Sequence, residues 1–207
     1  AYNEAEVLHG ISFQTQPGTM TAIVGPSGSG KSTIAKLMAG FWDVTSGTVR
    51  FGGQDIRNIP FGQLMGEISY VAQDNFLFDK SIRENIRMGR RDATDAEVEA
   101  AAHAAGCDNF ISELEHGYET NVGGGGAHLS GGEKQRISIA RCLLKDAPIV
   151  IFDEATANVD PENEDQLQRA MEALTREKTV LMIAHRLKTV RGADQILVLD
   201  QGSVVQK

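Results

Sequence analysis

The run IVGPSGSGKST, residues 23–33, places a lysine and a hydroxyl side chain directly after a glycine-rich turn. Its spacing matches G-x-x-x-x-G-K-[ST], a pattern whose backbone N–H groups cradle phosphate oxygens. Lys31 can reach the β- and γ-phosphates of a nucleotide, and Ser32 can offer its hydroxyl to Mg²⁺. The sequence therefore predicts a nucleotide-binding loop formed by Gly25, Pro26, Ser27, Gly28, Ser29, Gly30, Lys31, Ser32 and Thr33.

A second run, PIVIFDEAT at residues 148–156, is an apolar strand that ends in two acids. Acids at the carboxyl end of a parallel strand lie where ligands bind in open α/β sheets. Asp153 is suited to hold Mg²⁺, and Glu154 can act as general base on an attacking water. Two solvated acids after an ordinary strand are the alternative explanation.

A third run, LSGGE at residues 129–133, predicts a helix start that is open to an anion. Ser130 and Glu133 have the spacing of a capping box. Gly131 and Gly132 carry no side chain, so a phosphate can approach the backbone amides closely.

The elements that position these residues alternate in type. Strand-length apolar runs, several of them continuous, suit strands of a parallel sheet. They occupy residues 7–13, 21–25, 48–51, 68–73, 148–154, 179–185 and 195–200. Helical patterns cover residues 30–41, 94–106, 131–147 and 161–177. Residues 76–135 are nearly strandless, which indicates an α/β core with a helical insertion.

The composition narrows the class of protein. Of the 207 residues, 41% are hydrophobic and 23% are charged, as in soluble globular domains. The net charge of −8 disfavours nucleic acid as the main partner. No apolar run approaches the roughly 18–20 residues of a membrane span. Cys107 and Cys142 lack metal-ligand spacing, so we expect reduced thiols.

These motifs together resemble the nucleotide-binding domains of ABC transporters. The phosphate loop and the strand ending at Asp153 resemble the Walker A and Walker B motifs, and LSGGEKQR, residues 129–136, is similar to the family's signature motif. YVAQDNFLF is similar to the Q-loop, ATANVD to the D-loop and MIAHR to the switch-histidine segment. The opening AYNEAEVLHGISF and the run VAQDNFLFDKSIRENI are typical of the exporter-type subgroup.

The resemblance implies a role for each matching residue. Tyr2 would stack on adenine, Gln73 would ligate Mg²⁺ and respond to the γ-phosphate, and His185 would hydrogen-bond that phosphate. Asp160 would contact a second subunit. Alone, these four residues have ordinary structural explanations: a terminal tyrosine, a loop glutamine, a structural histidine and a helix cap.

The resemblance also implies a fold and an organisation. We expect an α/β fold: a P-loop NTPase, RecA-like core with a mostly parallel sheet, an N-terminal antiparallel β subdomain and an ABC-specific α-helical subdomain insertion. One ABC ATPase domain would span residues 1–207, with its core at about 1–75 and 145–207 and its helical subdomain at about 76–144.

The function implied is Mg²⁺-dependent ATP hydrolysis in a head-to-tail domain dimer. Ser130, Gly131, Gly132 and Glu133 of one subunit would meet the ATP held by the other. We expect a transmembrane domain fused upstream of the sequence given, and a site of action at the cytoplasmic face of the inner membrane. A soluble ABC-type ATPase acting on ribosomes or DNA is the alternative, and a small-molecule kinase is a more distant one.

The chain departs from the family's commonest pattern at VGGGG, residues 122–126. Exporters often have V-G-E-x-G here, with the acid facing the membrane domain, whereas this chain has Gly124. In this segment the chain resembles exporter-shaped transporters associated with iron–siderophore handling, among which a comparable glycine-rich variant occurs. The resemblance suggests that substrate class. Glu133, where glutamine is frequent, and TANVD, in place of S-A-L-D, are smaller departures.

Overall fold

The computed structural model describes residues 6–153, 161–184, 190 and 192–207, and in the helix beginning at Pro161 it describes side chains from Asp165 onward. The chain forms two compact units. The first comprises Ala1–Tyr70, Pro148–Glu154 and Glu177–Lys207, and the second comprises Val71–Ala147 and Ala155–Arg176. The phosphate-loop run and Asp153 therefore belong to the first unit, and the LSGGE run belongs to the second.

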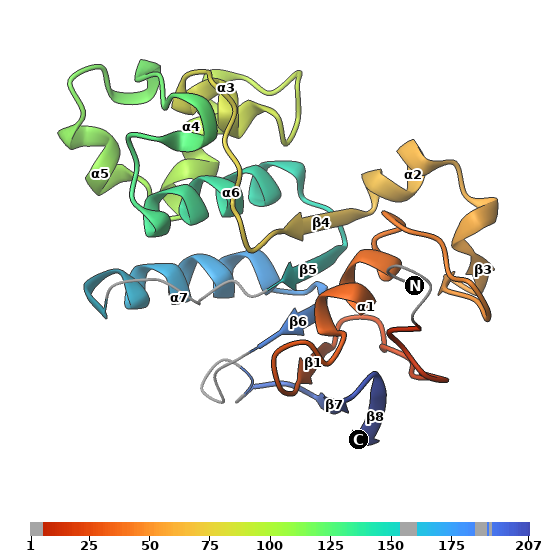
Figure 1. Ribbon diagram of the computed structural model, residues 1–207. Coiled ribbons are helices and arrows are strands. Elements are labelled where there is room, and N and C mark those ends of the chain that lie inside the picture. Colours follow the sequence, from red (N-terminus) through yellow and green to blue (C-terminus); the bar gives the residue numbers. More distant parts are fainter. Residues whose placement is uncertain (1–5, 154–160, 185–189, 191) are drawn as a thin grey trace. The chain divides into compact units, whose positions relative to one another are not determined.

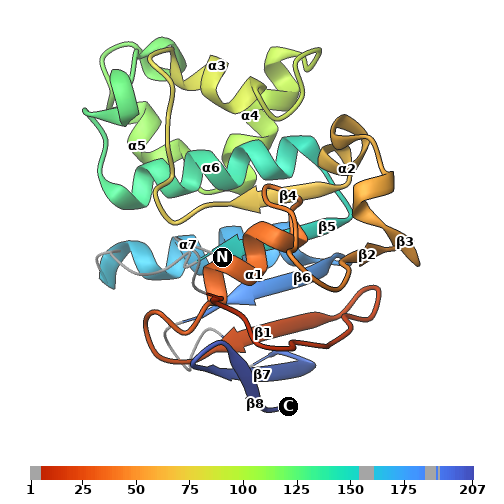
Figure 2. The same ribbon diagram turned by 45° about the vertical axis from the view of Figure 1, so that its right-hand side comes forward.

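The first unit is built on a six-stranded sheet (Figure 2). Its strands are β1 (Met20–Val24), β4 (Ile68–Val71), β5 (Ile149–Asp153), β6 (Thr179–Ile183), β7 (Gln195–Asp200) and β8 (Ser203–Gln206). They lie in the order β4-β5-β6-β1-β7-β8. β5, β6, β1 and β7 pair in parallel, and β8 returns antiparallel to β7. The predicted α/β class with a mostly parallel sheet is confirmed.

A short antiparallel pair, β2 (Arg50–Phe51) with β3 (Gln54–Asp55), supplies the antiparallel β element expected in the N-terminal part. The Asp55 carboxylate accepts a hydrogen bond from the backbone N–H of Arg57 (3.0 Å) and so begins the 3₁₀ turn η1 (Ile56–Asn58). The helices of this unit are α1 (Lys31–Met38) and α2 (Phe61–Gly66).

The strand expected over residues 7–13 does not form, so that prediction was wrong. Gly10 has a φ of +59°, which interrupts the extended run. The His9 N–H donates a hydrogen bond to the Gly202 carbonyl (2.7 Å), but residues 7–13 do not pair with a neighbouring strand. Leu8, Ile11 and Phe13 instead pack against the core of the unit. Its apolar alternation thus reflects side-chain packing rather than strand pairing.

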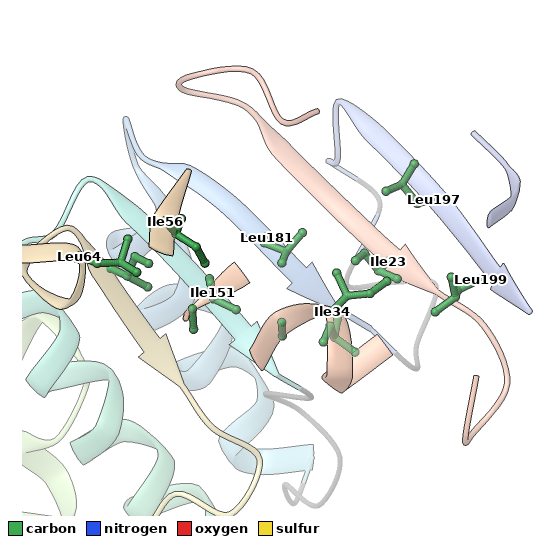
Figure 3. Packing of buried hydrophobic residues seen from close by; sticks show 12 residues of the cluster. Ile23, Ile34, Ile56, Leu64, Ile151, Leu181, Leu197 and Leu199 are labelled. Atoms are coloured by element: carbon green, nitrogen blue, oxygen red, sulfur yellow. The ribbon is translucent and has the colours of Figure 1, made fainter. Parts of the chain in front are cut away.

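Apolar side chains of the sheet and of α1 form the core of the first unit (Figure 3). Ile23 of β1 and Ile34 of α1 belong to this core together with the strand residues Leu181 and Leu197. Full burial of each such side chain contributes about 1.5–3 kcal/mol. Because β1 and α1 share this core, the loop that joins them is anchored at both of its ends.

The second unit is helical (Figure 1). It contains α3 (Ile82–Arg87), α4 (Asp95–Ala104), α5 (Asp108–Glu113), η2 (Gly117–Glu119), η3 (Gly124–Gly126), α6 (Gly131–Lys145) and α7 (Pro161–Thr175). α6 packs against α3, α4 and α7. Ile137, Ala140 and Leu144 of α6 are buried, as their spacing predicted. In the described part of residues 76–135, strand pairing is limited to an isolated bridge between Ser81 and Asn121, which confirms the strandless interpretation.

The helix boundaries follow local chemistry. The predicted capping box of Thr94 and Glu97 begins α4, and Gly106 follows its end with a φ of +68°. Pro161 occupies the first position of α7, as expected. Although α7 falls in the range expected for the core, it belongs to the second unit. The predicted limits of the helical subdomain stay a prediction.

Candidate nucleotide site

The loop between β1 and α1 turns tightly because two glycines allow close packing around it. A Cβ on Gly25 would overlap the backbone carbonyl of Leu199 on β7, and the φ of Gly25 is +154°. Gly30, with a φ of +102°, directly precedes α1, and a Cβ there would lie 2.6 Å from Leu8 Cδ2. The Gly202 N–H donates to the Ser29 carbonyl (3.1 Å) and ties the loop to the turn after β7.

Lys31 is held inside this loop. Its side chain is buried at 4% exposure. The Nζ ammonium donates to the backbone carbonyls of Gly25 (3.0 Å) and Pro26 (2.8 Å). A buried ammonium is costly unless it is paired or hydrogen-bonded. The loop carbonyls meet this need and hold the cation within the loop.

The start of α1 is open to an anion. The first turn of any helix has backbone N–H groups without an intrahelical acceptor. Gly30 makes no side-chain cap, and the first turn contains no acidic residue. Ser29 is 4% exposed, and its Oγ has no hydrogen-bond partner within the described part of the chain. These donors and the helix dipole fit a phosphate group.

Asp153, at the carboxyl end of β5, joins this loop through hydroxyl groups. The Ser32 hydroxyl donates to Asp153 Oδ1 (2.7 Å), and the Tyr70 hydroxyl donates to Asp153 Oδ2 (2.8 Å). Asp153 is 4% exposed, so its carboxylate is buried against these donors. A hydroxyl and a carboxylate oxygen side by side are the hard ligands that Mg²⁺ prefers, together with phosphate oxygens. The donor set therefore fits Mg²⁺.

The start of α6, in the second unit, is capped by its own side chains. Ser130 Oγ accepts a hydrogen bond from the Glu133 N–H (3.3 Å), and Glu133 Oε2 accepts one from the Ser130 N–H (2.7 Å). This confirms the predicted capping box. Ser130 and Gly131 are exposed, whereas Gly132 is buried.

The sequence profile of the ABC transporter family matches residues 8–157. The chain belongs to the ABC transporter family. It is 50% identical over 200 residues to the mycobactin import ATP-binding/permease protein IrtA of Mycolicibacterium smegmatis, covering 97% of this chain and 23% of that protein. It is 47% identical over 205 residues to the β-(1→2)glucan export ATP-binding/permease protein NdvA of Agrobacterium fabrum, covering 99% and 35%.

A solved structure gives the same result for the fold. A bacterial Atm1-family ABC exporter with ATP bound superposes with a TM-score of 0.93 and 46% sequence identity, covering 100% of this chain and 36% of that one. The P-loop NTPase fold and the exporter-type ABC assignment are therefore confirmed. The chain spans about a quarter to a third of the length of these relatives.

The ABC ATP-binding domain described here brings together part of the predicted site. The loop from Gly25 to Thr33 and Asp153 lie in the first unit, and Ser32 contacts Asp153 directly. Gln73 is exposed in a turn after β4 and belongs to the second unit, as do residues 130–133. The predictions for Tyr2, Glu154, Asp160 and His185 lie outside the described residues.

The segment after Gln73 in this ABC domain is fixed by two polar side chains, one buried and one half-buried. Asn85 is fully buried, accepts from the Phe78 N–H (2.9 Å) and donates to the Phe78 carbonyl (3.0 Å). Arg141 donates to the carbonyls of Phe76 (2.8 Å) and Asn85 (2.6 Å), and burial lowers its pKa to about 10. Phe76 and Phe78 remain 55% and 48% exposed and contact each other edge to face.

Gly124 is not required by the local fold. It lies exposed in the 3₁₀ turn Gly124–Gly126, and a Cβ added there would meet no atom within 4 Å. The adjacent Gly125 N–H donates to the Leu77 carbonyl (3.0 Å), which joins this turn to the segment after Gln73. An acidic side chain at position 124 would thus fit the backbone, and its absence has no explanation within the described residues.

Sequence reasoning missed Tyr70. Its hydroxyl contacts the proposed metal ligand Asp153, yet the run ISYVAQ was interpreted only as a strand leading to Gln73. The available signal was a hydroxyl-bearing ring near the carboxyl end of a largely buried strand. The partner of Tyr70 could not be identified because β4 and β5 are far apart in sequence. The sequence of neither strand determines the register in which the two lie side by side.

No helix in the described parts of the chain is both long enough and apolar enough to span a bilayer.

Proposed function

We propose that this chain binds ATP with Mg²⁺ and hydrolyses it to drive a membrane transporter. The observation that carries the proposal is the buried Lys31 beside an uncapped helix start, with Ser32 hydrogen-bonded to Asp153. Membership of the ABC transporter family supports it. So does the likeness to an Atm1-family exporter that has ATP bound.

The loop would bind the triphosphate through three kinds of donor. The Lys31 ammonium would exchange part of its contact with the Gly25 and Pro26 carbonyls for phosphate oxygens, at little cost because it is already desolvated. The Ser29 hydroxyl would donate to a phosphate, which would end its lack of a partner within the described residues. The amides at the start of α1 would add their dipole. Tyr2 would stack on adenine.

Ser32, Asp153 and Gln73 would hold Mg²⁺ with the phosphates. Because Ser32 donates its proton to Asp153, the lone pairs of its oxygen are left to face the cation. Mg²⁺ bound there would neutralise charge that develops on the phosphates.

Hydrolysis would use Glu154 as general base and His185 as a donor to the γ-phosphate. The most direct test is ATP turnover of the 207-residue chain and its Glu154→Gln variant. Loss of a general base lowers turnover by about 10²–10⁴-fold. Glu115→Gln is a matched control, because Glu115 is an exposed residue of the second unit. Equal turnover of chain and Glu154→Gln variant would contradict the base assignment.

We further propose a head-to-tail dimer in which Ser130, Gly131, Gly132 and Glu133 approach the ATP of the other subunit, with Asp160 at the interface. The capping box leaves a helix N-terminus with the dipole and small residues that suit a phosphate. Glu154→Gln with Mg²⁺ and ATP should sediment as a dimer, since trapped ATP holds the two domains together. A strictly monomeric profile at high protein concentration would contradict the dimer.

The membrane partner would be a transmembrane domain fused upstream, and the ATP-binding domain would act at the cytoplasmic face of the inner membrane. Support comes from relatives named as ATP-binding/permease proteins, of which this chain covers 23–35%. A soluble ATPase of ribosomes or DNA gains no comparable support. Sequencing the gene upstream of the Ala1 codon tests the arrangement: a six-span membrane domain is expected, and an intervening stop codon would overturn it.

We propose an iron–siderophore-related substrate. The glycine-rich VGGGG segment and the 50% identity to a protein named for mycobactin import support it. A relative named for glucan export is 47% identical, so identity alone does not separate the two. Uptake or efflux of radiolabelled ferric siderophore by the full-length transporter in vesicles should depend on ATP. Movement of labelled glucan alone would overturn the proposal.

A further inference from the structure

We propose that Tyr70 is a positioning residue for the divalent cation: by holding Asp153, it keeps the Ser32 oxygen directed at the metal. The inference rests on the proposed ATP-binding function and adds to it a role for a residue to which the motifs assign none. It is carried by the hydrogen-bonded series Tyr70–Asp153–Ser32, which joins β4, β5 and α1 of the first unit.

The series begins with the burial of Asp153. A carboxylate that is only 4% exposed has lost most of its water and needs donors from the protein. Ser32 Oγ supplies one at 2.7 Å to Oδ1, and Tyr70 Oη supplies another at 2.8 Å to Oδ2. Hydrogen bonds from hydroxyls to carboxylates are among the stronger ones in proteins. Because each carboxylate oxygen accepts a hydrogen bond from a different hydroxyl group, the orientation of the carboxylate plane is fixed.

Tyr70 is suited to this task because its ring is itself held. The ring packs on Phe41 with a centroid separation of 5.0 Å and an interplanar angle of 59°. Phe41 follows the C-terminal end of α1, the helix whose first turn carries Ser32. β4 lies next to β5 in the sheet, so the reach from Tyr70 to Asp153 is set by backbone pairing and not by a mobile side chain.

The consequence falls on Ser32. A serine hydroxyl has one proton and two lone pairs, and only the lone pairs can bind a cation. While Asp153 Oδ1 accepts the proton, the lone pairs are free for Mg²⁺. If Tyr70 lost its hydroxyl, the carboxylate could rotate about its Cβ–Cγ bond, and the Ser32 proton would no longer have one defined direction. Cation affinity should then fall, while the phosphate donors of the loop stay intact.

The test is the gain in ATP affinity that Mg²⁺ provides. Fluorescent ATP is titrated into the 207-residue chain in Mg²⁺ and in EDTA. The Kd in EDTA divided by the Kd in Mg²⁺ gives the gain, and this ratio is compared between variants. Tyr70→Phe should reduce that ratio by roughly three- to tenfold and leave the EDTA value unchanged. Tyr118→Phe removes the same atom from a ring that lies over Arg83 in the second unit, and it should leave both values unchanged.

A double variant separates positioning from general loosening of the fold. In an Asp153→Asn background, Tyr70→Phe should change the ratio by less than about twofold, because the carboxylate through which Tyr70 acts is gone. An equal loss in Mg²⁺ and in EDTA would overturn the inference, because it indicates a structural role only. An unchanged ratio, or equal effects in both backgrounds, would also overturn it. Phe41→Leu, which keeps the Tyr70 hydroxyl but removes its support, should reduce the ratio less than Tyr70→Phe.

The same titration distinguishes this inference from the proposed function. If the unmodified chain binds ATP in neither buffer, the proposed function fails and the inference falls with it. If the unmodified chain binds ATP and Mg²⁺ tightens that binding, the proposed function stands whatever Tyr70→Phe does, and only the role of Tyr70 is decided by the variant.

Discussion

The helices α1 and α6 both begin in glycine-rich segments that are predicted to meet phosphate, but their first turns are completed in opposite ways. α6 begins with a full capping box, in which Ser130 and Glu133 satisfy each other's backbone N–H groups. α1 begins after Gly30 in a left-handed conformation, without a side-chain cap and without an acid in its first turn. Both starts carry the positive end of a helix dipole.

The difference indicates how each start obtains its stability. A cap of the α6 type contributes about 1 kcal/mol from within the helix itself. α1 has no such contribution, so its start depends on packing of the loop against β7 and on whatever anion its amides bind. We infer that the start of α1 is specialised for holding a ligand, and that the start of α6 is stable without one.

Adding a methyl group where the α1 loop packs most closely should have the largest effect. In Gly25→Ala the new methyl group would overlap the Leu199 carbonyl, which is backbone and cannot move aside cheaply. We expect a loss of about 3 kcal/mol in the free energy of unfolding, measured by urea denaturation. Gly28→Ala is the matched control in the same loop, since no atom lies within 4 Å of its Cβ, and only its φ of +79° costs about 1 kcal/mol. Equal costs for the two variants would contradict the packing argument.

Removing the cation at the α1 start should affect binding more than stability. Lys31→Ala deletes the ammonium that the Gly25 and Pro26 carbonyls hold, and we expect ATP affinity to fall by about 100-fold, or about 2.7 kcal/mol. Lys36→Ala, at the other end of the same helix, where Lys36 lies over the Trp42 ring, should leave affinity within about twofold. Isothermal titration calorimetry measures both. Comparable losses would show that the α1 start is not the phosphate site.

Local chemistry made both helix starts predictable from the sequence. G-x-x-x-x-G-K-S and S-x-x-E are short-range patterns, and a glycine turn or a capping box forms between residues that are close along the chain. The apolar runs predicted the strands β1, β4, β5, β6 and β7 for a related reason, because burial of a whole parallel strand leaves a continuous apolar segment.

What failed or was missed depended on long-range partners. Residues 7–13 have the apolar content of a strand, but strand formation also needs a neighbouring backbone and an uninterrupted extended φ, which Gly10 does not allow. Tyr70 contacts Asp153 across 83 positions of sequence, a pairing set by sheet register. The roles of Tyr2, Gln73, Asp160 and His185 came from resemblance, and the role of Glu154 came from its place after an apolar strand. All five stay predictions.

Removing the cap of α6 should have a smaller effect than either change at α1. Ser130→Ala leaves the Glu133 N–H without its acceptor and breaks one half of the capping box. We expect a loss of about 1 kcal/mol in the free energy of unfolding, with no change in ATP affinity of the monomeric chain. Ser130→Asp, which keeps an acceptor at the cap, should restore most of the stability. If Ser130→Ala has no effect, α6 is not held by its own cap, and the contrast with α1 disappears.

The smallest effect concerns the interior of the second unit, to which both cysteines of the chain belong. Burial raises the pKa of the Cys107 thiol from 9.0 to about 12. Between these values the folded chain keeps a proton that the unfolded chain loses, so the stability due to this thiol is complete well below pH 9, begins to fall as the pH approaches 9 and is lost as the pH rises toward 12. From pH 8 to pH 9 the free energy of unfolding should fall by about 0.4 kcal/mol through this group. Urea denaturation of the chain and of Cys107→Ala at the two pH values isolates the contribution, because the variant should lack it. The same slope in both would mean that the thiol is reached by solvent, and that the second unit is less tightly closed around Cys107 than its full burial indicates.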